Sequence, residues 1–394
     1  MFRIKSKSPW FLRYSSGGPY KYTNGFSQCL NIHNRTLYAI STLGVDSFKM
    51  VQEKINFQFV NMTEKFRNKM QQISSPSTSN IIFTEDFKNM IHLAHNTPED
   101  INLVKTLLMK FNRQSKEVPF GNYVFGPVLM RMFYCMGNIE VPLELFKNPE
   151  LEGFFHQAIS YQILMDMLYE RTQYQEILKL YDSCKNESLK DQRHLIVLVM
   201  AACYRINSNE SFNYAIDLWS QLTREGKILM RKASTFAAGL ALRQNDPEMA
   251  LKIISTIRQQ SYMTVRNIRI LASARLNRFE WLSVNLKEIM EFGKQCETNK
   301  PSISEDVLSE VLTSLHKNCN KELNNEIHRL SKMLQDHGHV TDKSLNELLT
   351  MQISATSFNA SRVNQNNVLA GSFKSSTSRS VIPRFVHPGL AELK

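Results

Sequence analysis

Pairs of apolar residues recur at a nearly constant step along the middle of the chain. Successive pairs begin 37, 35, 38, 35 and 36 residues apart. A period of this length with no strand signals between the pairs is typical of stacked helical hairpins, each of which buries its apolar face against its neighbours. The pattern predicts an all-α fold, an α-solenoid of helix-turn-helix repeats. The pairs are Leu108-Met109, Leu145-Phe146, Leu180-Tyr181, Leu218-Trp219, Ile253-Ile254 and Ile289-Met290.

Helix start signals divide each period into two helices. Thr97-Pro98-Glu99 and Asp246-Pro247-Glu248 each combine a capping side chain, a proline and an acid, which is how the second helix of a hairpin would begin. We therefore expect about five or six hairpins over residues 83–292. The first helices are marked by bulky residues near their starts, namely Phe87, Tyr123, Tyr161, Ile196, Phe236 and Ile268.

Other patterns flank this array. Apolar residues at steps of three and four predict an amphipathic helix over 46–72, followed by a polar linker over 73–82. Beyond 292 the period fades, and helix signals over 293–347 predict capping helices. Residues 348–394 are rich in Ser and Asn, with no acid before Glu392, which predicts a disordered tail.

The charge pattern changes the interpretation of the N-terminus. Residues 1–45 contain six Lys or Arg, many Ser and no acid, which is typical of a disordered mitochondrial transit peptide; an ordinary basic tail is the alternative. The whole chain carries +12, so the remainder would keep +6 (12 minus 6). This charge favours polyanionic partners, either nucleic acid or an acidic membrane face. No run of about 18 apolar residues occurs, so no membrane span is predicted.

Catalytic and metal-binding motifs are absent from the sequence. The six cysteines form no C-x-x-C pair, and His92/His95 and His337/His339 have no third ligand nearby. There is no glycine-rich phosphate loop and no nucleophile elbow. We therefore expect neither an enzyme nor a bound metal or cofactor.

One hairpin carries a family resemblance. Residues 159–164, ISYQIL, resemble the opening of a pentatricopeptide repeat, and residues 177–181, ILKLY, resemble its second helix. The segments 121–134 and 160–170 resemble animal mitochondrial members of this family, within a likeness that covers 83–340. The resemblance implies a protein of the mitochondrial matrix that acts in transcript maturation. In this family, two side chains of a repeat can read one RNA base.

The resemblance also indicates binding positions. The base-reading positions correspond to Gln162 and Gln192 in this hairpin, with Val124 and Val197 in its neighbours. Valine cannot hydrogen-bond a base edge, so no base-by-base target follows, and Gln162 and Gln192 could instead be solvated surface residues. Basic residues expected on the concave side would contact phosphates, although many could simply solvate helix faces. The candidates for these contacts are Arg193, Arg231, Lys232, Arg258, Arg266 and Arg269.

Two functions are consistent with these patterns. The leading hypothesis is a non-catalytic protein that binds single-stranded mitochondrial RNA and takes part in transcript processing, with a separate nuclease or mitoribosomal proteins as further partners. The alternative is a protein-interaction scaffold, such as a component or assembly factor of the mitochondrial ribosome. The valines at 124 and 197 favour the alternative, because they remove base-reading groups.

Overall fold

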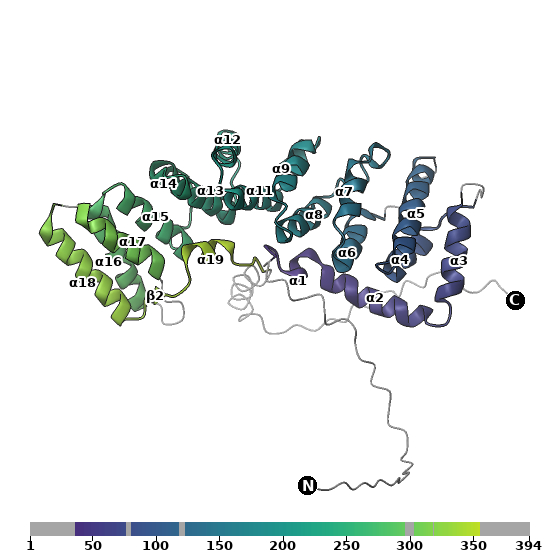
Figure 1. Cartoon of the computed structure of the whole chain (residues 1–394), viewed down its shortest axis with the longest axis horizontal. Helices are drawn as coiled ribbons and strands as arrows, with labels where there is room; N and C mark the ends of the chain where they lie inside the picture. Colours follow the sequence, from purple (N-terminus) through teal and green to yellow (C-terminus); the bar gives the residue numbers. More distant parts are fainter. Residues whose placement is uncertain (1–35, 76–79, 118–122, 296–302, 318, 355–394) are drawn as a thin grey trace, which may run out of the picture. The chain divides into compact units, whose positions relative to one another are not determined.

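The computed structural model describes residues 36–75, 80–117, 123–295, 303–317 and 319–354 (Figure 1). Six consecutive helical hairpins lie between residues 84 and 295, which confirms the predicted α-solenoid. Their first and second helices are α4 (Thr84–Leu93) and α5 (Pro98–Glu117), α6 (Gly126–Met136) and α7 (Glu140–Lys147), α8 (Ala158–Glu170) and α9 (Tyr174–Ser183), α11 (Arg193–Ile206) and α12 (Asn209–Arg224), α13 (Arg231–Arg243) and α14 (Pro247–Ser255), and α15 (Met263–Arg275) and α16 (Phe279–Gln295). Two short helices, η1 (Pro149–Leu151) and α10 (Glu187–Lys190), lie in the connections between hairpins.

The hairpins pack in chain order. Each first helix contacts the first helix of the next hairpin, from α4 through α15, and the same succession is visible in Figure 1. All six anchor pairs lie on second helices, and at least one member of each pair is buried. Burying such a side chain contributes about 1.5–3 kcal/mol relative to exposure. The apolar period in the sequence is therefore the packing period of the hairpins.

A residue with left-handed backbone recurs in the turn between the two helices of each hairpin from α6–α7 onward. These residues are Gly137, Thr172, Asn207, Asn245 and Asn277, with φ between 52° and 66°. Asparagine and glycine tolerate this conformation, whereas a β-branched threonine is strained in it. The turn residues define equivalent positions in successive hairpins.

The stretch 46–72 forms two helices, so the expected single amphipathic helix is wrong. Helix α2 (Val45–Phe59) and α3 (Thr63–Ser74) are separated by a turn in which the Met62 amide and the Thr63 hydroxyl both donate to the Phe59 carbonyl, at 2.8 and 2.7 Å. These bonds end α2 because they replace the helical partner of that carbonyl. Helix α2 packs on α4 and α3 on α5, so the pair extends the array by one hairpin.

Part of the expected linker 73–82 is also ordered against the array. Helix α3 continues to Ser74, while residues 76–79 lie outside the described residues. Ile82 is buried, and its amide and carbonyl both hydrogen-bond to the side chain of Gln114 at 2.9 Å. The linker is therefore shorter than its composition predicted.

Residues 36–45 belong to the core, so the expected transit-peptide range of 1–45 extends too far. Leu37, Tyr38 and Val45 are fully buried, and Ile40–Leu43 forms the short helix α1. The lack of acids in this segment does not distinguish a presequence from a buried segment, because both can be free of acidic residues. Residues 1–35 lie outside the described residues.

The C-terminal region continues the array and then returns along it. Helix α17 (Glu305–Ser314) packs on α15 and α18 (Lys321–Asp336) on α16, where capping helices were expected; η2 (Leu315–Lys317) follows α17. Strand β1 (Ile303–Ser304) pairs in parallel with β2 (Val340–Thr341), a small departure from an all-helical chain. Helix α19 (Leu345–Thr350) then packs on α13 and α15.

Residues 348–354 are folded, which corrects the expected start of a disordered tail at 348. Leu348 and Leu349 are buried. The amide of Ile353 donates to the Leu37 carbonyl at 2.8 Å, and the amide of Ala39 donates to the Ile353 carbonyl at 2.9 Å. This pairing joins segments from the two ends of the sequence. Residues 355–394 lie outside the described residues.

Candidate nucleic-acid interface

Gln162, the leading candidate for base contact, is covered by the chain itself. It is 6% exposed, and Asp166 lies one helical turn later on the same face of α8. The Asp166 carboxyl accepts a hydrogen bond from the Tyr38 amide at 3.1 Å. The segment before α1 therefore closes this face of α8, and Gln162 is unavailable to a ligand in this arrangement.

Burial changes the ionisation of the groups under this segment. It raises the pKa of the Asp166 carboxyl to about 8, although backbone amides of the docked segment oppose the shift. The Tyr38 hydroxyl is hydrogen-bonded to Nδ1 of His194 on α11 at 3.1 Å, and burial lowers the pKa of that histidine. Both groups are neutral near pH 7, which suits an enclosed contact better than an anion-binding one.

Helix α19 closes the same face further along the array. The Lys232 ammonium on α13 donates to the Leu348 carbonyl at 3.4 Å, and burial lowers the pKa of Lys232 to about 8. A β-carbon at Gly239 would lie 2.8 Å from Cδ1 of Leu349, so the helices touch at this glycine. The guanidinium of Arg243 donates to the Asn346 side chain at 2.8 Å. Lys232 is therefore held inside the chain.

The turn register places the equivalents of Gln162 at Val197, Thr235 and Asn267, each ten residues before the left-handed residue. All three are fully buried. The Asn267 side-chain oxygen accepts from the Ser304 amide at 2.9 Å, so its polar group is used within the fold. We call these residues, with Gln162 and Asp166, the covered face.

The same register changes the interpretation of Tyr123 and Val124. Both precede α6, which begins at Gly126, and both side chains are exposed. Val124 is therefore not equivalent to Gln162, and Tyr123 is not a first-helix anchor. The buried aromatic residue at this point is Phe125.

The other predicted contact residues differ in exposure and in the elements that carry them. Gln192 and Arg193 are exposed at the start of α11, and the Gln192 side chain donates to the Ser188 carbonyl at 3.3 Å. Arg258 is exposed in the connection after α14. Arg266 is buried in α15.

Two further candidates contact neighbouring side chains. The Arg231 guanidinium lies 3.6 Å from the centre of the Tyr262 ring, and Arg269 donates to the side-chain oxygen of Gln260. Arg231, Arg258 and Arg269 therefore lie in or against the connection between α14 and α15, whereas Gln192 and Arg193 lie at the start of α11.

A row of arginines lies instead at the C-terminal ends of the first helices. Arg205, Arg243 and Arg275 each stand two residues before the left-handed turn residue, and Arg171 stands directly before Thr172. Cations are favoured there because the last carbonyls of a helix have no partner within it and carry negative partial charge. We call Arg171, Arg205, Arg243 and Arg275 the arginine row.

Each arginine of the row reaches back to the preceding hairpin. Arg171 donates to the Gly137 carbonyl at 3.3 Å, and Arg275 donates to the Leu242 carbonyl. Nε of Arg205 donates to the Tyr169 hydroxyl at 3.0 Å. These contacts fix the spacing of positive charge to the spacing of the hairpins, about 8–10 Å between packed helices.

Arg243 makes two contacts with Tyr204 of the preceding hairpin. Its guanidinium donates to the Tyr204 carbonyl at 3.1 Å and lies 3.9 Å from the centre of the Tyr204 ring. The stacked guanidinium is therefore held by a hydrogen bond and a cation–π contact together.

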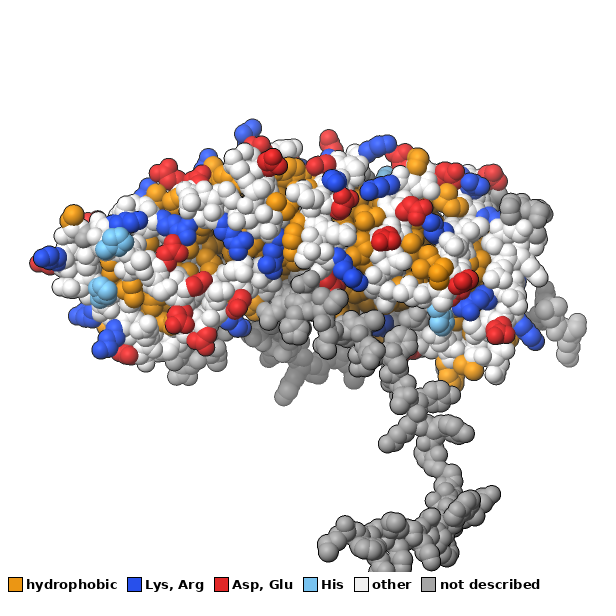
Figure 2. Space-filling model, viewed as in Figure 1, with side chains coloured by type: hydrophobic (Ala, Val, Ile, Leu, Met, Phe, Trp, Pro, Cys, Tyr) orange, Lys and Arg blue, Asp and Glu red, His pale blue; other side chains and the backbone are white. Residues whose placement is uncertain are grey.

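The row keeps donors available to an anion. Arg171, Arg205 and Arg243 are exposed, and none of them pairs with a carboxylate among the described residues. Arg275 is partly buried and pairs with Glu310 at 2.7 Å. A guanidinium has five N–H donors, so one carbonyl bond leaves several free. Figure 2 shows Lys and Arg side chains following one another across the middle of the view, over the first helices from α8 to α15.

Comparisons with known proteins identify the relatives of this chain. No family model matches it. It is 31% identical over 246 residues to pentatricopeptide repeat-containing protein 2, mitochondrial, of Homo sapiens, covering 62% of each chain. The Mus musculus protein of the same name is 29% identical over 287 residues, which cover 72% of this chain and 73% of the relative. The chain is homologous to animal pentatricopeptide repeat-containing protein 2.

The homology covers between 62% and 72% of this chain in the human and mouse proteins. The protein of Danio rerio is 27% identical over 276 residues, 68% of this chain and 70% of the relative. The match spans less than two thirds of the human relative. The homologues are named as mitochondrial proteins, and the predicted pentatricopeptide resemblance is confirmed.

The chain differs from the sequence expectation in where its basic side chains lie. Bulky first-helix residues do not reveal the arginine row, because they are not equivalent from hairpin to hairpin. Relative to the left-handed turn residue, Phe236 and Ile268 stand two residues out of register with Tyr161 and Ile196. The sequence signal for this row is an arginine just before each turn. Starting from Arg171, the successive steps are 34, 38 and 32 residues.

Two features are absent from the described residues, a metal-binding cluster and a membrane-spanning helix. Within the described ranges, no three His, Cys, Asp or Glu residues lie close enough together to hold a metal ion. None of the helices in those ranges combines the length and apolar character needed to cross a bilayer.

Proposed function

We propose that this chain is a non-catalytic mitochondrial protein that binds single-stranded RNA in the matrix and supports maturation of mitochondrial transcripts. A separate nuclease would carry out any cleavage, with mitoribosomal proteins as further partners. The homology to pentatricopeptide repeat-containing protein 2 supports the class of function. The arginine row is the observation that carries RNA contact.

The chemistry of the row suits a phosphate backbone. Guanidinium groups match phosphate oxygens in geometry and stay charged at all physiological pH values. Such contacts release counterions, so affinity falls as salt rises, by about 0.7 in the logarithmic slope for each contacted phosphate of a single strand. Phosphate contacts carry no sequence information, so we expect sequence-tolerant binding.

The test removes charge from the exposed part of the row. In a triple variant, Arg171→Ser, Arg205→Ser and Arg243→Ser, the slope of log affinity against log salt should fall by about two for a single-stranded oligoribonucleotide. A matched triple of Arg→Lys at the same positions keeps the charge and should keep most of the slope. In a second control, Ser replaces three lysines that already pair with glutamates. These are Lys105, Lys179 and Lys185, which pair with Glu144, Glu176 and Glu152.

Two results would contradict this proposal. The first is wild-type protein with no measurable affinity for single-stranded RNA, together with no RNA recovered by crosslinking in mitochondria. The second is an unchanged salt slope in the Arg→Ser triple, provided that its circular dichroism matches the wild type.

A scaffold function is the second candidate, and α2 favours it. Phe57 and Met50 on this helix are 83% and 71% exposed, and Val60, directly after it, is 67% exposed. Exposed apolar side chains on one helix are typical of protein-interaction sites. If the chain is a component or assembly factor of the mitochondrial ribosome, the pair Met50→Ser and Phe57→Ser should abolish its cofractionation with ribosomal particles, and the arginine triple should not.

A further inference from the structure

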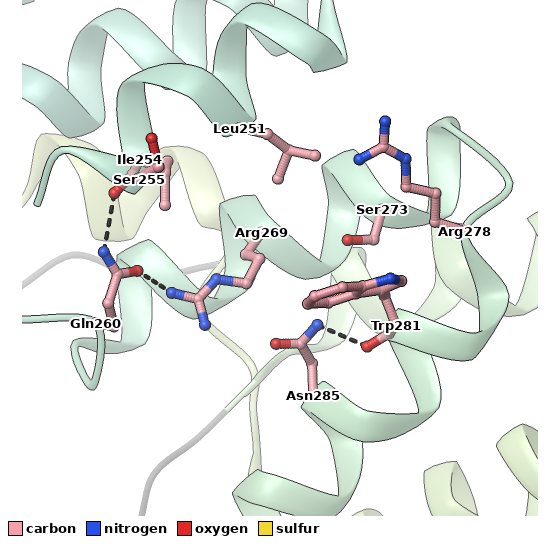
Figure 3. A pocket seen from close by; sticks show the side chains of 9 residues that line it. All are labelled: Leu251, Ile254, Ser255, Gln260, Arg269, Ser273, Arg278, Trp281 and Asn285. Atoms are coloured by element: carbon pink, nitrogen blue, oxygen red, sulfur yellow. Dashed lines mark hydrogen bonds between the residues drawn. The ribbon is translucent and has the colours of Figure 1, made fainter.

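A hollow of about 330 Å³ opens between α14, α15 and α16 (Figure 3). Leu251 of α14 contributes an apolar wall, and Gln260 lies in the connection between α14 and α15. Arg269 is carried by α15, and Trp281 by α16. The volume lies within the range of about 300–1,000 Å³ that is typical of ligand sites.

Trp281 is the unusual residue of this hollow. Its side chain is 66% exposed, whereas Trp219 on α12 is buried as an anchor between hairpins. In Figure 3 the indole ring lies across the hollow from Arg269, with Arg278 above it and Asn285 below it. An exposed indole contributes no packing to the fold, and in a hollow it presents a flat aromatic face to a ligand.

The polar groups around the indole suit a neutral ring with an attached anion. The side chain of Gln260 accepts from Arg269 and donates to the Ile254 carbonyl at 3.0 Å. The Asn285 amide donates to the Trp281 carbonyl at 2.7 Å, and its side-chain oxygen points toward Arg269. No Asp or Glu lines the hollow.

The position of the hollow links it to the arginine row. Arg275, the last member of the row, and Arg269 both lie on α15. Arg278 follows three residues after Arg275, in the turn that leads into α16. Three residues span at most about 11 Å, so a strand that follows the row arrives beside the hollow.

We propose that the hollow receives one unpaired nucleobase of single-stranded RNA, which stacks on Trp281 while Arg278 holds an adjacent phosphate. Stacking on an aromatic side chain tolerates every base, because each base has a π-face. The side-chain oxygen of Asn285 can hydrogen-bond a base edge, whereas the Gln260 amide is held by Arg269 and the Ile254 carbonyl. This inference rests on the proposed RNA-binding function and adds a specific anchoring point to it.

The experiment measures binding of a single-stranded oligoribonucleotide to the full chain by titration. Trp281→Ala should lower affinity about 5- to 150-fold, the range found for loss of one stacked base, with the salt slope unchanged. Arg278→Ser should instead lower the slope by about 0.7. Phe83→Ala removes an aromatic residue that is 60% exposed directly before α4 and serves as the matched control with wild-type affinity.

Intrinsic fluorescence gives a second readout. The wild type contains three tryptophans, and RNA should quench the exposed indole. Trp281→Phe preserves an aromatic face, so it should bind RNA with an affinity near that of the wild type but without most of the quenching.

The outcomes separate this inference from the function on which it rests. If the wild type binds RNA while Trp281→Ala and Arg278→Ser match it in affinity and slope, the nucleobase site is wrong and the arginine row stands alone. If the wild type binds no RNA, both proposals fail. Loss of affinity in Trp281→Ala, with the control unaffected, supports the site.

Discussion

The first helices of this array present two regions that differ in what remains exposed after folding. Their covered face carries polar residues such as Gln162, Thr235 and Asn267, and all of these are buried beneath the chain's own segments. Their C-terminal ends carry the arginine row: Arg171 and Arg205 each donate a hydrogen bond to the preceding hairpin, and Arg171, Arg205 and Arg243 remain exposed. The difference shows that a polar residue marks a binding surface only when its groups remain available after folding.

The largest effect should come from loosening the cover of the first region. Leu349→Ala removes a buried side chain of α19 that contacts Gly239, and we expect a loss of about 2–5 kcal/mol in the docking of that helix. Hydrogen exchange over residues 345–353 should accelerate accordingly. Met351→Ala is the control, because Met351 is exposed and should cost at most about 0.5 kcal/mol. Equal exchange in the two variants would mean that α19 is not held by this contact.

A second prediction concerns the proton on Asp166. Its pKa rises from 3.8 to about 8 in the folded chain, so between these values the folded protein keeps a proton that the unfolded chain releases. This contribution makes stability fall as pH rises through that window, by up to about 1.4 kcal/mol per pH unit.

The Asp166→Asn variant tests this contribution by chemical denaturation at pH 5, 6 and 7. Its free energy of unfolding should decline less with pH than that of the wild type, because the variant has no proton to release. The exposed Asp217 offers a control, since Asp217→Asn should keep the wild-type slope. Parallel curves for all three proteins would contradict an enclosed, protonated Asp166.

The smallest effect is expected at the turns beside the arginine row. Thr172 has φ of 60°, where its equivalents are asparagines. Thr172→Asn should stabilise the chain by about 0.5–1 kcal/mol, because asparagine adopts this conformation with less strain. The reverse change, Asn207→Thr, should destabilise it by a similar amount, and thermal unfolding measures both. A destabilised Thr172→Asn variant or a stabilised Asn207→Thr variant would mean that the turns are not equivalent.

The sequence predicted the repeat array because its packing is local. Leu180 and Tyr181 bury against adjacent helices, so their spacing alone identifies the hairpin. It did not predict the docking of residues 36–39 on 351–354, because the pairing of Tyr38 with Ile353 joins distant segments without any periodic signal. This contact, together with the packing of α1 and α19, moved the expected boundaries at 45 and 348.

The candidate site was less predictable than the fold for a related reason. Gln162 matches a family position, but it is buried, and the segment of Tyr38, distant in sequence, docks on Asp166 one helical turn away. The arginine row depends on the register of the turns, which is set by the backbone at residues such as Asn245. The basic character of the chain was predictable, whereas the surface that uses it required the structure.

The central claim is that single-stranded RNA binds at the arginine row while the covered face stays closed. Hydrogen exchange of the wild type with and without a single-stranded oligoribonucleotide tests this most directly. We predict slower exchange around the turns at 171–174, 205–209 and 243–247, with no acceleration over 36–48 or 345–353. Faster exchange over those two covering segments on RNA binding, with no protection at the turns, would contradict the account.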